Sequence, residues 1–124
     1  MPEPLVILSR TYDLLAWLLP KGERFPRVYR YTVTRRLLGA AMDLQEDLFQ
    51  AQARRGELRL RYLQGADAAL NSLRSYLRMA HEWAWLNDGQ YQHVSLMVAE
   101  VGRLLGGWLR QTEAALRERG TSEP

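Results

Sequence analysis

The chain has 124 residues, 47% hydrophobic and 25% charged, so it can bury one core and is predicted to form a single domain over residues 1–124. It contains no cysteine, which excludes disulfides, thiolate nucleophiles and cysteine metal ligands. The formal net charge of +3 sets 17 basic against 14 acidic side chains, an excess too small to establish nucleic-acid binding by itself.

The first predicted helix covers residues 4–20 and ends where Pro20 and Gly22 interrupt the pattern. Its apolar run over residues 14–19 is far too short to cross a bilayer, and the N-terminus lacks the basic region of a signal peptide. We therefore expect a soluble, cytoplasmic protein with no membrane partner. The predicted core positions lie three and four residues apart, at Leu5, Leu8, Tyr12, Leu15 and Leu19.

The second predicted helix covers residues 26–54, with Pro26 in its first turn, where the missing N–H costs no hydrogen bond, and Gly56 beyond its end. The β-branched residues 32–34 leave its start open, and an extended segment before Tyr31 is an alternative. Its predicted core positions are Thr34, Leu37, Ala41, Leu44, Leu48 and Ala51.

The third predicted helix covers residues 57–86 and has an unusually wide apolar face. Residues 87–89 then form a turn, in which Asp88 is the predicted N-cap of the next helix. The predicted core positions are Leu63, Ala66, Leu70, Leu73, Leu77, Ala80 and Ala84, flanked by Tyr62, Ala69, Tyr76 and Trp83.

The fourth predicted helix covers residues 89–118, and residues 120–124 are expected to form a frayed tail. Connections this short force neighbouring helices to run antiparallel. The predicted fold is therefore all-α, an antiparallel up-down-up-down four-helix bundle. The core positions of the fourth helix are Val94, Met97, Val101, Leu104, Trp108 and Ala115, with a second row at Tyr91, Val98, Leu105 and Leu109.

Reactive side chains do not form a recognisable catalytic or metal-binding pattern. His81 and His93 each lack the acidic residue three positions earlier that a di-metal bundle site requires. Asp43, Glu46 and Asp47 share one helix face, where we interpret them as solvated or paired with arginines of a neighbouring helix. We therefore predict no catalytic residue, metal, cofactor or small-molecule substrate, and we do not expect an enzyme.

Three glycines in the fourth helix, Gly102, Gly106 and Gly107, superficially resemble a phosphate-binding loop, but the Lys-Ser/Thr ending is absent and the pattern is helical. Each costs roughly 0.5–1 kcal/mol relative to alanine in a helix interior, so it needs another explanation. Two of them form a smooth strip with Ala99, which another backbone can approach either inside the bundle or from a second subunit. The predicted oligomer interface contains Trp83, Trp85, Gly102 and Gly106.

Almost all positive charge is arginine, since Lys21 is the only lysine, and the planar donors of arginine suit phosphates and bases. No acidic residue lies between Glu23 and Asp43, where arginines alternate with aromatic residues, a pattern that favours phosphates and unpaired bases. The predicted nucleic-acid or partner-binding residues are Arg24, Arg27, Arg30, Arg35, Arg36, Arg54, Arg55, Arg59, Arg61, Arg74, Arg78, Arg103, Arg110 and Arg117.

Two simpler explanations of the arginines stay open. A GC-rich genome or a hot habitat also enriches arginine. Acidic residues such as Glu57, Glu100 and Glu113 dilute the positive charge, so the arginines could simply keep the surface soluble.

Four segments together resemble one known family: residues 12–20 (YDLLAWLLP), 25–27 (FPR), 31–37 (YTVTRRL) and 101–109 (VGRLLGGWL). The chain is similar to the four-helix-bundle proteins that include those encoded by ribosomal-RNA intervening sequences and the Avd proteins of diversity-generating retroelements. The last segment favours the retroelement branch. The sequence departs from that pattern at Thr34, where glycine is commoner.

The resemblance implies a non-catalytic accessory protein that assembles as a five-fold barrel, a homopentamer, with a basic exterior. Such a protein binds the retroelement reverse transcriptase together with template RNA or cDNA, and supports mutagenic reverse transcription. The alternative is a structural oligomerisation module of the intervening-sequence branch, without a nucleic-acid role.

Overall fold

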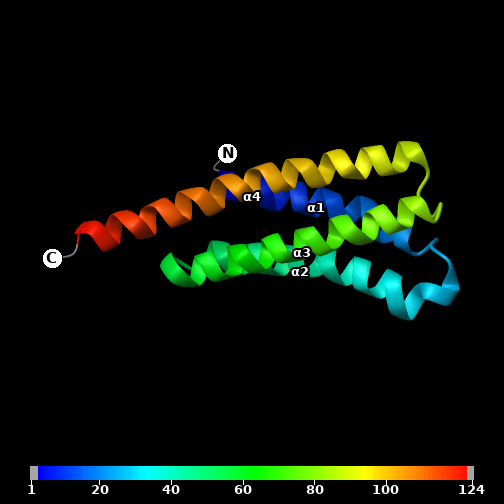
Figure 1. Cartoon of the computed structure of the whole chain (residues 1–124), viewed down its shortest axis with the longest axis horizontal. Helices are drawn as coiled ribbons and strands as arrows, with labels where there is room; N and C mark the ends of the chain where they lie inside the picture. The colour runs from blue at the N-terminus through cyan, green and yellow to red at the C-terminus, as the bar shows by residue number, and fades with distance from the viewer. Residues whose placement is uncertain (1–2, 123–124) are drawn as a thin grey trace.

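The computed structural model describes residues 3–122, which form four α-helices: α1 (Glu3–Gly22), α2 (Arg35–Ala53), α3 (Gly56–Glu82) and α4 (Asp88–Ser122). Two short helices of other types connect α1 to α2, the 3₁₀-helix η1 (Arg27–Tyr29) and the π-helix η2 (Arg30–Thr34). Within residues 3–122 there is no strand. Successive α-helices run in opposite directions (Figure 1), so the predicted all-α, up-down-up-down four-helix bundle is confirmed.

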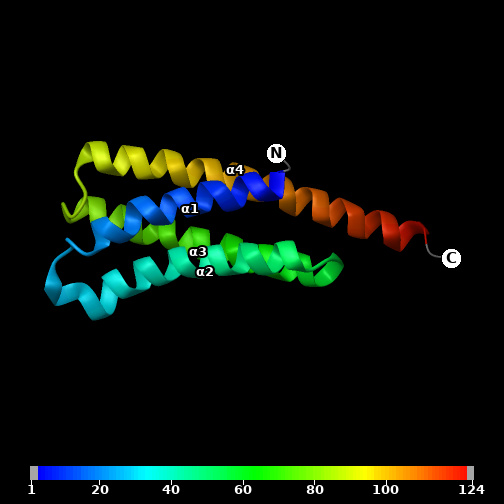
Figure 2. The same ribbon diagram turned by 180° about the vertical axis from the view of Figure 1, so that it is seen from behind.

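Each helix packs against its two neighbours around the bundle, α1 and α3 both lying against α2 and α4. The longest helix, α4, has 35 residues, and its C-terminal part extends beyond the turn between α2 and α3 (Figures 1 and 2). None of the described helices combines the length and the hydropathy that crossing a bilayer requires.

The apolar stripes predicted for the second and third helices form the centre of the core. All of their predicted core positions are buried except Ala84, which is exposed. Regular spacing of apolar residues identified these two faces because each helix has one clear apolar side. The confirmed positions are Thr34, Leu37, Ala41, Leu44, Leu48 and Ala51, and Leu63, Ala66, Leu70, Leu73, Leu77 and Ala80.

The core face predicted for the first helix is wrong in part. Tyr12 is 65% exposed and Leu19 is 36% exposed, although both were expected inside, while the side chain of Leu5 lies outside the described residues. The segment is apolar over more than one face, so spacing alone did not choose between them, and packing against α2 and α4 did. The buried residues of α1 are Ile7, Thr11, Leu14, Leu15 and Leu18.

Both ends of the connection from α1 to α2 differ from the prediction. Pro20 lies within the last turn of α1 and does not end the helix, which continues to Gly22. The proline removes one N–H donor from that turn. Pro26 precedes η1 as its N-cap, and the chain is helical from Arg27 onward, so the extended alternative before Tyr31 is wrong. The second predicted helix is in fact three helices of different pitch.

The third helix ends at Glu82, four residues earlier than predicted, and the fourth continues to Ser122. Ala84 adopts a left-handed φ of 63°, and the N–H groups of Trp85 and Leu86 both donate to the Ala80 carbonyl at 2.8 and 3.2 Å. These bonds satisfy the end of α3 and close the turn. Residues 120–122 of the expected frayed tail are helical, and residues 123–124 lie outside the described residues.

Candidate nucleic-acid interface

The five arginines of residues 24–36, here called the arginine segment, lie on the connection between α1 and α2 and on the first turn of α2, at one end of the bundle (Figure 2). All five are exposed, and none makes an ion pair within the part of the chain that the structure describes. Cations without an internal partner remain available to an anionic ligand. The five residues are Arg24, Arg27, Arg30, Arg35 and Arg36.

Aromatic packing holds the arginine segment against the turn between α3 and α4. Phe25 is buried, and its ring centroid lies 5.3 Å from that of Trp85. The Tyr29 ring lies 5.1 Å from Trp85 and 5.6 Å from Trp83. These tilted contacts stabilise a connection that few other side chains cover. Trp85 is thus used within the chain, whereas Trp83 is 48% exposed.

Tyr31, Arg35 and Gly39 lie between two hollows of the surface. One hollow, of about 860 Å³, faces the end of α1, and the other, of about 510 Å³, is bounded on the α3 side by Ser72 and Tyr76. Concave sites of this size are where proteins usually hold small groups. Neither hollow could be predicted from the sequence, because the first depends on how the chain turns between α1 and α2, and the second on how α3 packs against α2.

Thr34, the last residue of η2, carries an unsatisfied hydroxyl. The residue is 6% exposed, and its Oγ1 has no hydrogen-bond partner. Thr112 is similarly buried, but its hydroxyl donates to the Trp108 carbonyl oxygen at 2.8 Å. A buried polar atom without a partner has lost its bonds to water without compensation. The unsatisfied hydroxyl of Thr34 therefore lowers the stability of the folded chain where η2 meets α2.

Thr34→Val is expected to stabilise the protein by about 1 kcal/mol, because valine keeps the shape of threonine and removes the unsatisfied hydroxyl. Urea denaturation of the variant and the wild type measures the difference. The matched control is Thr112→Val, which removes a hydroxyl that has a partner and should give no gain. A loss of stability in Thr34→Val would contradict the interpretation.

A second group of arginines lies at the opposite end of the α2–α3 hairpin (Figure 1). Arg59 has a structural use there: its Nε donates to the Ala51 carbonyl oxygen at 2.9 Å, and its guanidinium carbon lies 5.5 Å from the Trp108 ring centroid. The Arg54 guanidinium carbon lies 6.0 Å from the Tyr62 ring centroid. The group, all predicted as binding residues, consists of Arg54, Arg55, Arg59 and Arg61.

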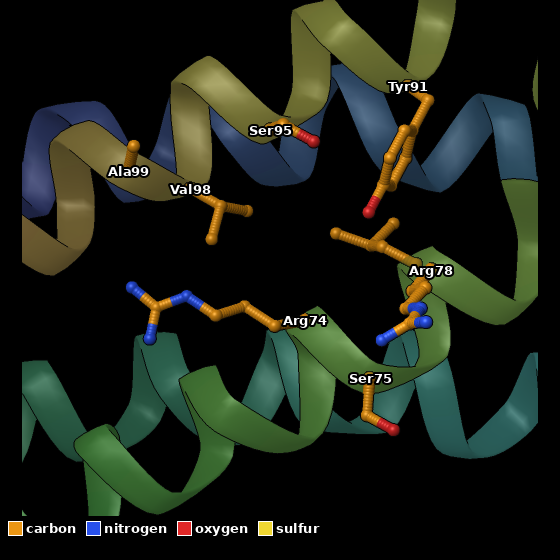
Figure 3. A pocket seen from close by; sticks show the side chains of 8 residues that line it. Arg74, Ser75, Arg78, Tyr91, Ser95, Val98 and Ala99 are labelled. Carbon is orange, nitrogen blue, oxygen red and sulfur yellow. The ribbon is translucent and has the colours of Figure 1, made fainter. Parts of the chain in front are cut away.

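Arg74 and Arg78, one turn apart on α3, line a pocket of about 490 Å³ between α3 and α4 (Figure 3). The hydroxyl of Tyr91 points into this pocket, and the guanidinium of Arg74 lies below Ala99. Arg78 is less available than Arg74 because its Nε lies 3.0 Å from the Glu82 carboxylate.

Gly102 makes room for the Arg74 side chain. A Cβ atom at Gly102 would collide with the Arg74 guanidinium, and Leu70 supplies the other near contact. At Gly106 the near atom belongs to the Arg110 side chain, at 3.4 Å from the added Cβ. Tight packing inside the bundle therefore explains Gly102, where α3 side chains fill the space, but not Gly106, which has only the end of Arg110 near it.

The arginines of α4 differ in their surroundings. Arg103 bonds to both carboxylate oxygens of Glu100, with donor–acceptor distances of 3.2 and 2.9 Å. The Arg103 hydrogen bond lowers the pKa of Glu100, and the charges of Arg103 and Arg10 add to the effect. Arg110 and Arg117 are exposed further along the helix. The three arginines of the predicted stripe therefore do not offer equal charge to a ligand.

The carboxylates of α2 were predicted to be either solvated or paired with arginines, and Asp43 and Glu46 are exposed, as in the first of these roles. Asp43, Glu46 and Asp47 make no ion pair within the described residues. Asp47 instead lies against Gly65 of α3, where an added Cβ would be 2.8 Å from its Oδ2. Burial raises the pKa of Asp47, and the negative charges of Asp43 and Glu46 raise it further. The helix face that holds these residues meets a glycine, not a basic side chain.

Asp47→Asn is expected to be more stable than the wild type near neutral pH. Because the pKa of Asp47 is higher in the folded than in the unfolded chain, ionisation favours unfolding, and wild-type stability falls as pH rises through the folded-state pKa. Below the ordinary carboxyl range both proteins carry an uncharged group, so the advantage should disappear. Urea denaturation at a series of pH values tests this, and a pH-independent difference would contradict it.

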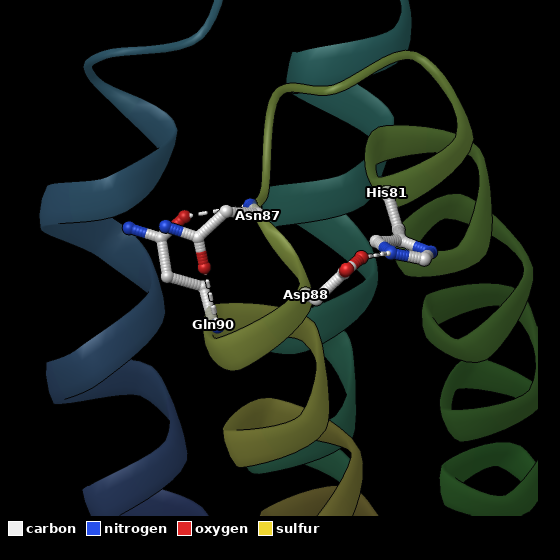
Figure 4. Close-up of polar contacts among 4 residues, drawn as sticks. All are labelled: His81, Asn87, Asp88 and Gln90. Atoms are coloured by element: carbon white, nitrogen blue, oxygen red, sulfur yellow. Dashed lines mark hydrogen bonds and ion pairs between the residues drawn. The ribbon is translucent and has the colours of Figure 1, made fainter.

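The two histidines, in the last turn of α3 and near the start of α4, take part in local contacts. His81 Nε2 lies 2.8 Å from Asp88 Oδ1, across the turn between α3 and α4 (Figure 4), and its ring stacks on Tyr91 with centroids 4.2 Å apart. His93 packs on Trp17 at 5.3 Å. Among the described residues, no three His, Cys, Asp or Glu side chains come close enough to hold a metal ion.

The N-cap of α4 is Asn87 and not the predicted Asp88. The Gln90 N–H donates to Asn87 Oδ1 at 2.8 Å, and the Asn87 N–H donates to Gln90 Oε1 at 2.9 Å (Figure 4). This reciprocal pair satisfies two donors at the helix start. Asp88 is displaced into the first turn, where its carboxylate faces His81.

Comparison with protein families identifies a relative family for this chain. The model of the bAvd-like family matches residues 5–112, which span all four α-helices and the arginine segment. No curated protein matches the chain.

Proposed function

Since the chain belongs to the bAvd-like family, we propose that it is the accessory protein of a diversity-generating retroelement. In this role it binds the reverse transcriptase of the element and its RNA or cDNA, and supports mutagenic reverse transcription. It acts by holding these partners and catalyses no step itself. The observation that carries the nucleic-acid part is the arginine segment, which is exposed and makes no ion pair within the described residues.

The proposed contact is with the phosphate backbone. Arginine guanidinium groups bind phosphate oxygens through paired donors, and such contacts position a nucleic acid without reading its sequence. Exposed Tyr31, at 78%, supplies a ring on which an unpaired base can stack. This combination favours a single-stranded nucleic acid.

The experiment is a salt titration of binding to a labelled single-stranded RNA, followed by fluorescence polarisation. Each phosphate contact should contribute a slope of about −0.7 to the plot of log affinity against log salt concentration. A steep linear fall is the expected result, and an affinity independent of salt would overturn the phosphate-contact proposal. Co-expression with the reverse transcriptase of the same element tests the protein partner, which should co-elute in size-exclusion chromatography.

We further propose a homo-oligomer, a pentamer, with the α4 surface at Gly106 and exposed Trp83 at its interfaces. The one atom that an added Cβ at Gly106 would meet belongs to the flexible side chain of Arg110, one turn along the same helix, so the surface there is open to another subunit. Gly106→Leu is expected to lower the molar mass measured by light scattering to that of a smaller species, while circular dichroism stays helical. The matched control is Gly107→Leu at the neighbouring glycine, where an added Cβ meets no atom within 4 Å. An unchanged oligomer in Gly106→Leu would remove this interface from the proposal.

A further inference from the structure

The larger of the two hollows is a groove between the end of α1, the π-helix η2 and the first turns of α2. Its volume is about 860 Å³. The residues that η2 and α2 contribute recur every four positions and therefore lie along one helix face. Figure 2 shows the end of α1 and the start of α2 on the same side of the molecule. The groove-lining residues used below are Glu23, Arg30, Tyr31, Arg35, Leu38 and Gly39.

The floor of the groove is apolar, and no side chain projects from it at Gly39. Leu38 packs on buried Gly22, where an added Cβ would lie only 2.9 Å from Leu38 Cδ2. At Gly39 an added Cβ would meet no atom within 4 Å, so the helix surface there is open. Met42, which is 42% exposed, continues the apolar floor. An apolar surface that no other side chain covers suits the face of a planar ring.

The rim of the groove is mostly cationic and aromatic. Arg30 and Arg35 are exposed and make no ion pair within the described residues, and Tyr31 is exposed between them. Glu23 lies on the α1 side and supplies one carboxylate acceptor. The rim thus offers two phosphate-binding side chains, a stacking ring and an acceptor for an amino group.

We propose that this groove binds one unpaired nucleotide of a single-stranded nucleic acid. The base lies on the floor formed by Leu38, Gly39 and Met42, and Arg30 and Arg35 bind the adjacent phosphates. Base stacking on aromatic and apolar side chains tolerates any sequence, and a duplex cannot offer its bases in this way. The inference rests on the proposed function, and adds that the strand is held by an unpaired base as well as by its charge.

The test fills the groove without altering any charge. Gly39→Leu places a side chain in the open space above the floor, and it also replaces a helix-interior glycine by a good helix former, so the fold should be kept. Gly107→Leu is the matched control, because it makes the same glycine-to-leucine change in a helix where an added Cβ also meets no atom within 4 Å, but it lies on α4 and outside the groove. Both variants are titrated with a short single-stranded oligoadenylate, with the same strand made abasic, and with a duplex.

Gly39→Leu should bind the intact strand about tenfold more weakly than the wild type, which corresponds to the loss of one stacked base. Gly107→Leu should bind it as the wild type does, and neither substitution should change binding of the duplex or of the abasic strand. Unchanged affinity of Gly39→Leu for the intact strand would overturn the inference, and so would an equal loss on the abasic strand.

Two further outcomes identify what else could be wrong. If Gly39→Leu changes the oligomer seen by light scattering but not the affinity for the strand, the groove holds a second copy of the chain and the inference fails. If the wild type binds none of the three nucleic acids, the proposed nucleic-acid function itself fails. Because the variants keep every arginine, failure of the groove alone leaves the salt-dependent binding of the wild type intact.

Discussion

Replacing Arg27, Arg30 and Arg36 together by glutamine is expected to weaken binding of single-stranded RNA about a hundredfold near 0.1 M salt. Each phosphate contact with a single strand releases ~0.7 counterion, which at that salt concentration is worth ~0.7 log unit of affinity, so three contacts give about 2. The slope of log affinity against log salt should become shallower by about 2 for the same reason. Fluorescence polarisation over a salt series measures both quantities.

The comparison variant removes three charges at the other end of the α2–α3 hairpin, at Arg54, Arg55 and Arg61. Both triple variants lower the formal net charge from +3 to 0, so any difference between them reports where the charge lies. The variant in the arginine segment is expected to lose more affinity. Equal losses would mean that net charge alone governs binding, which would contradict the assignment of the arginine segment as the interface.

Arg59→Ala is expected to lower the free energy of unfolding by about 2 kcal/mol. Arg59 donates to two carbonyl oxygens in the last turn of α2, Ala51 at 2.9 Å and Gln52 at 3.5 Å, and packs over Trp108 of α4. The substitution removes both of these side-chain hydrogen bonds at the end of α2, and it removes a cation–π contact that joins the hairpin to α4. Urea denaturation followed by circular dichroism measures the change.

Arg61 provides the matched control for Arg59. It lies two residues further along α3, is exposed, and makes no ion pair within the described residues. Arg61→Ala removes the same charge and should change stability by no more than about 0.5 kcal/mol, as surface substitutions usually do. Equal stabilities of the two variants would show that the contacts of Arg59 do not stabilise the fold. Arg59 would then again be a candidate for binding a nucleic acid or a partner.

The arginines thus fall into two groups, those expected to bind a ligand and those that stabilise the fold, and the side chains and carbonyls around each one decide its group. Arg59 was predicted to act together with Arg54, Arg55 and Arg61 because the four are close in the chain. Of these four side chains, only that of Arg59 donates to backbone carbonyls within the described residues. Similar differences separate Arg78 and Arg103, which face carboxylates, from the arginine segment.

Much of the fold followed from the pattern of apolar residues. The α2 and α3 faces were predicted correctly because small and large apolar residues repeat with one helical period on one side only. The α1 face was not, since the segment from Leu14 to Leu19 is apolar all round and offers several possible stripes. Ala84 continued the spacing of α3, but the bonds from Trp85 and Leu86 to Ala80 end the helix before it.

The sequence by itself determined that this protein is an all-helical bundle whose positive charge is carried by arginine and is concentrated where acids are absent. Only the structure decided which arginines have a partner: helix geometry brings carboxylates to Arg78 and Arg103 from three or four residues away, and helix packing brings the Trp108 ring to Arg59. It also decided that Gly39 opens a groove while Gly102 accommodates Arg74. Both are glycines within helices, and what lies opposite each one depends on how the helices pack.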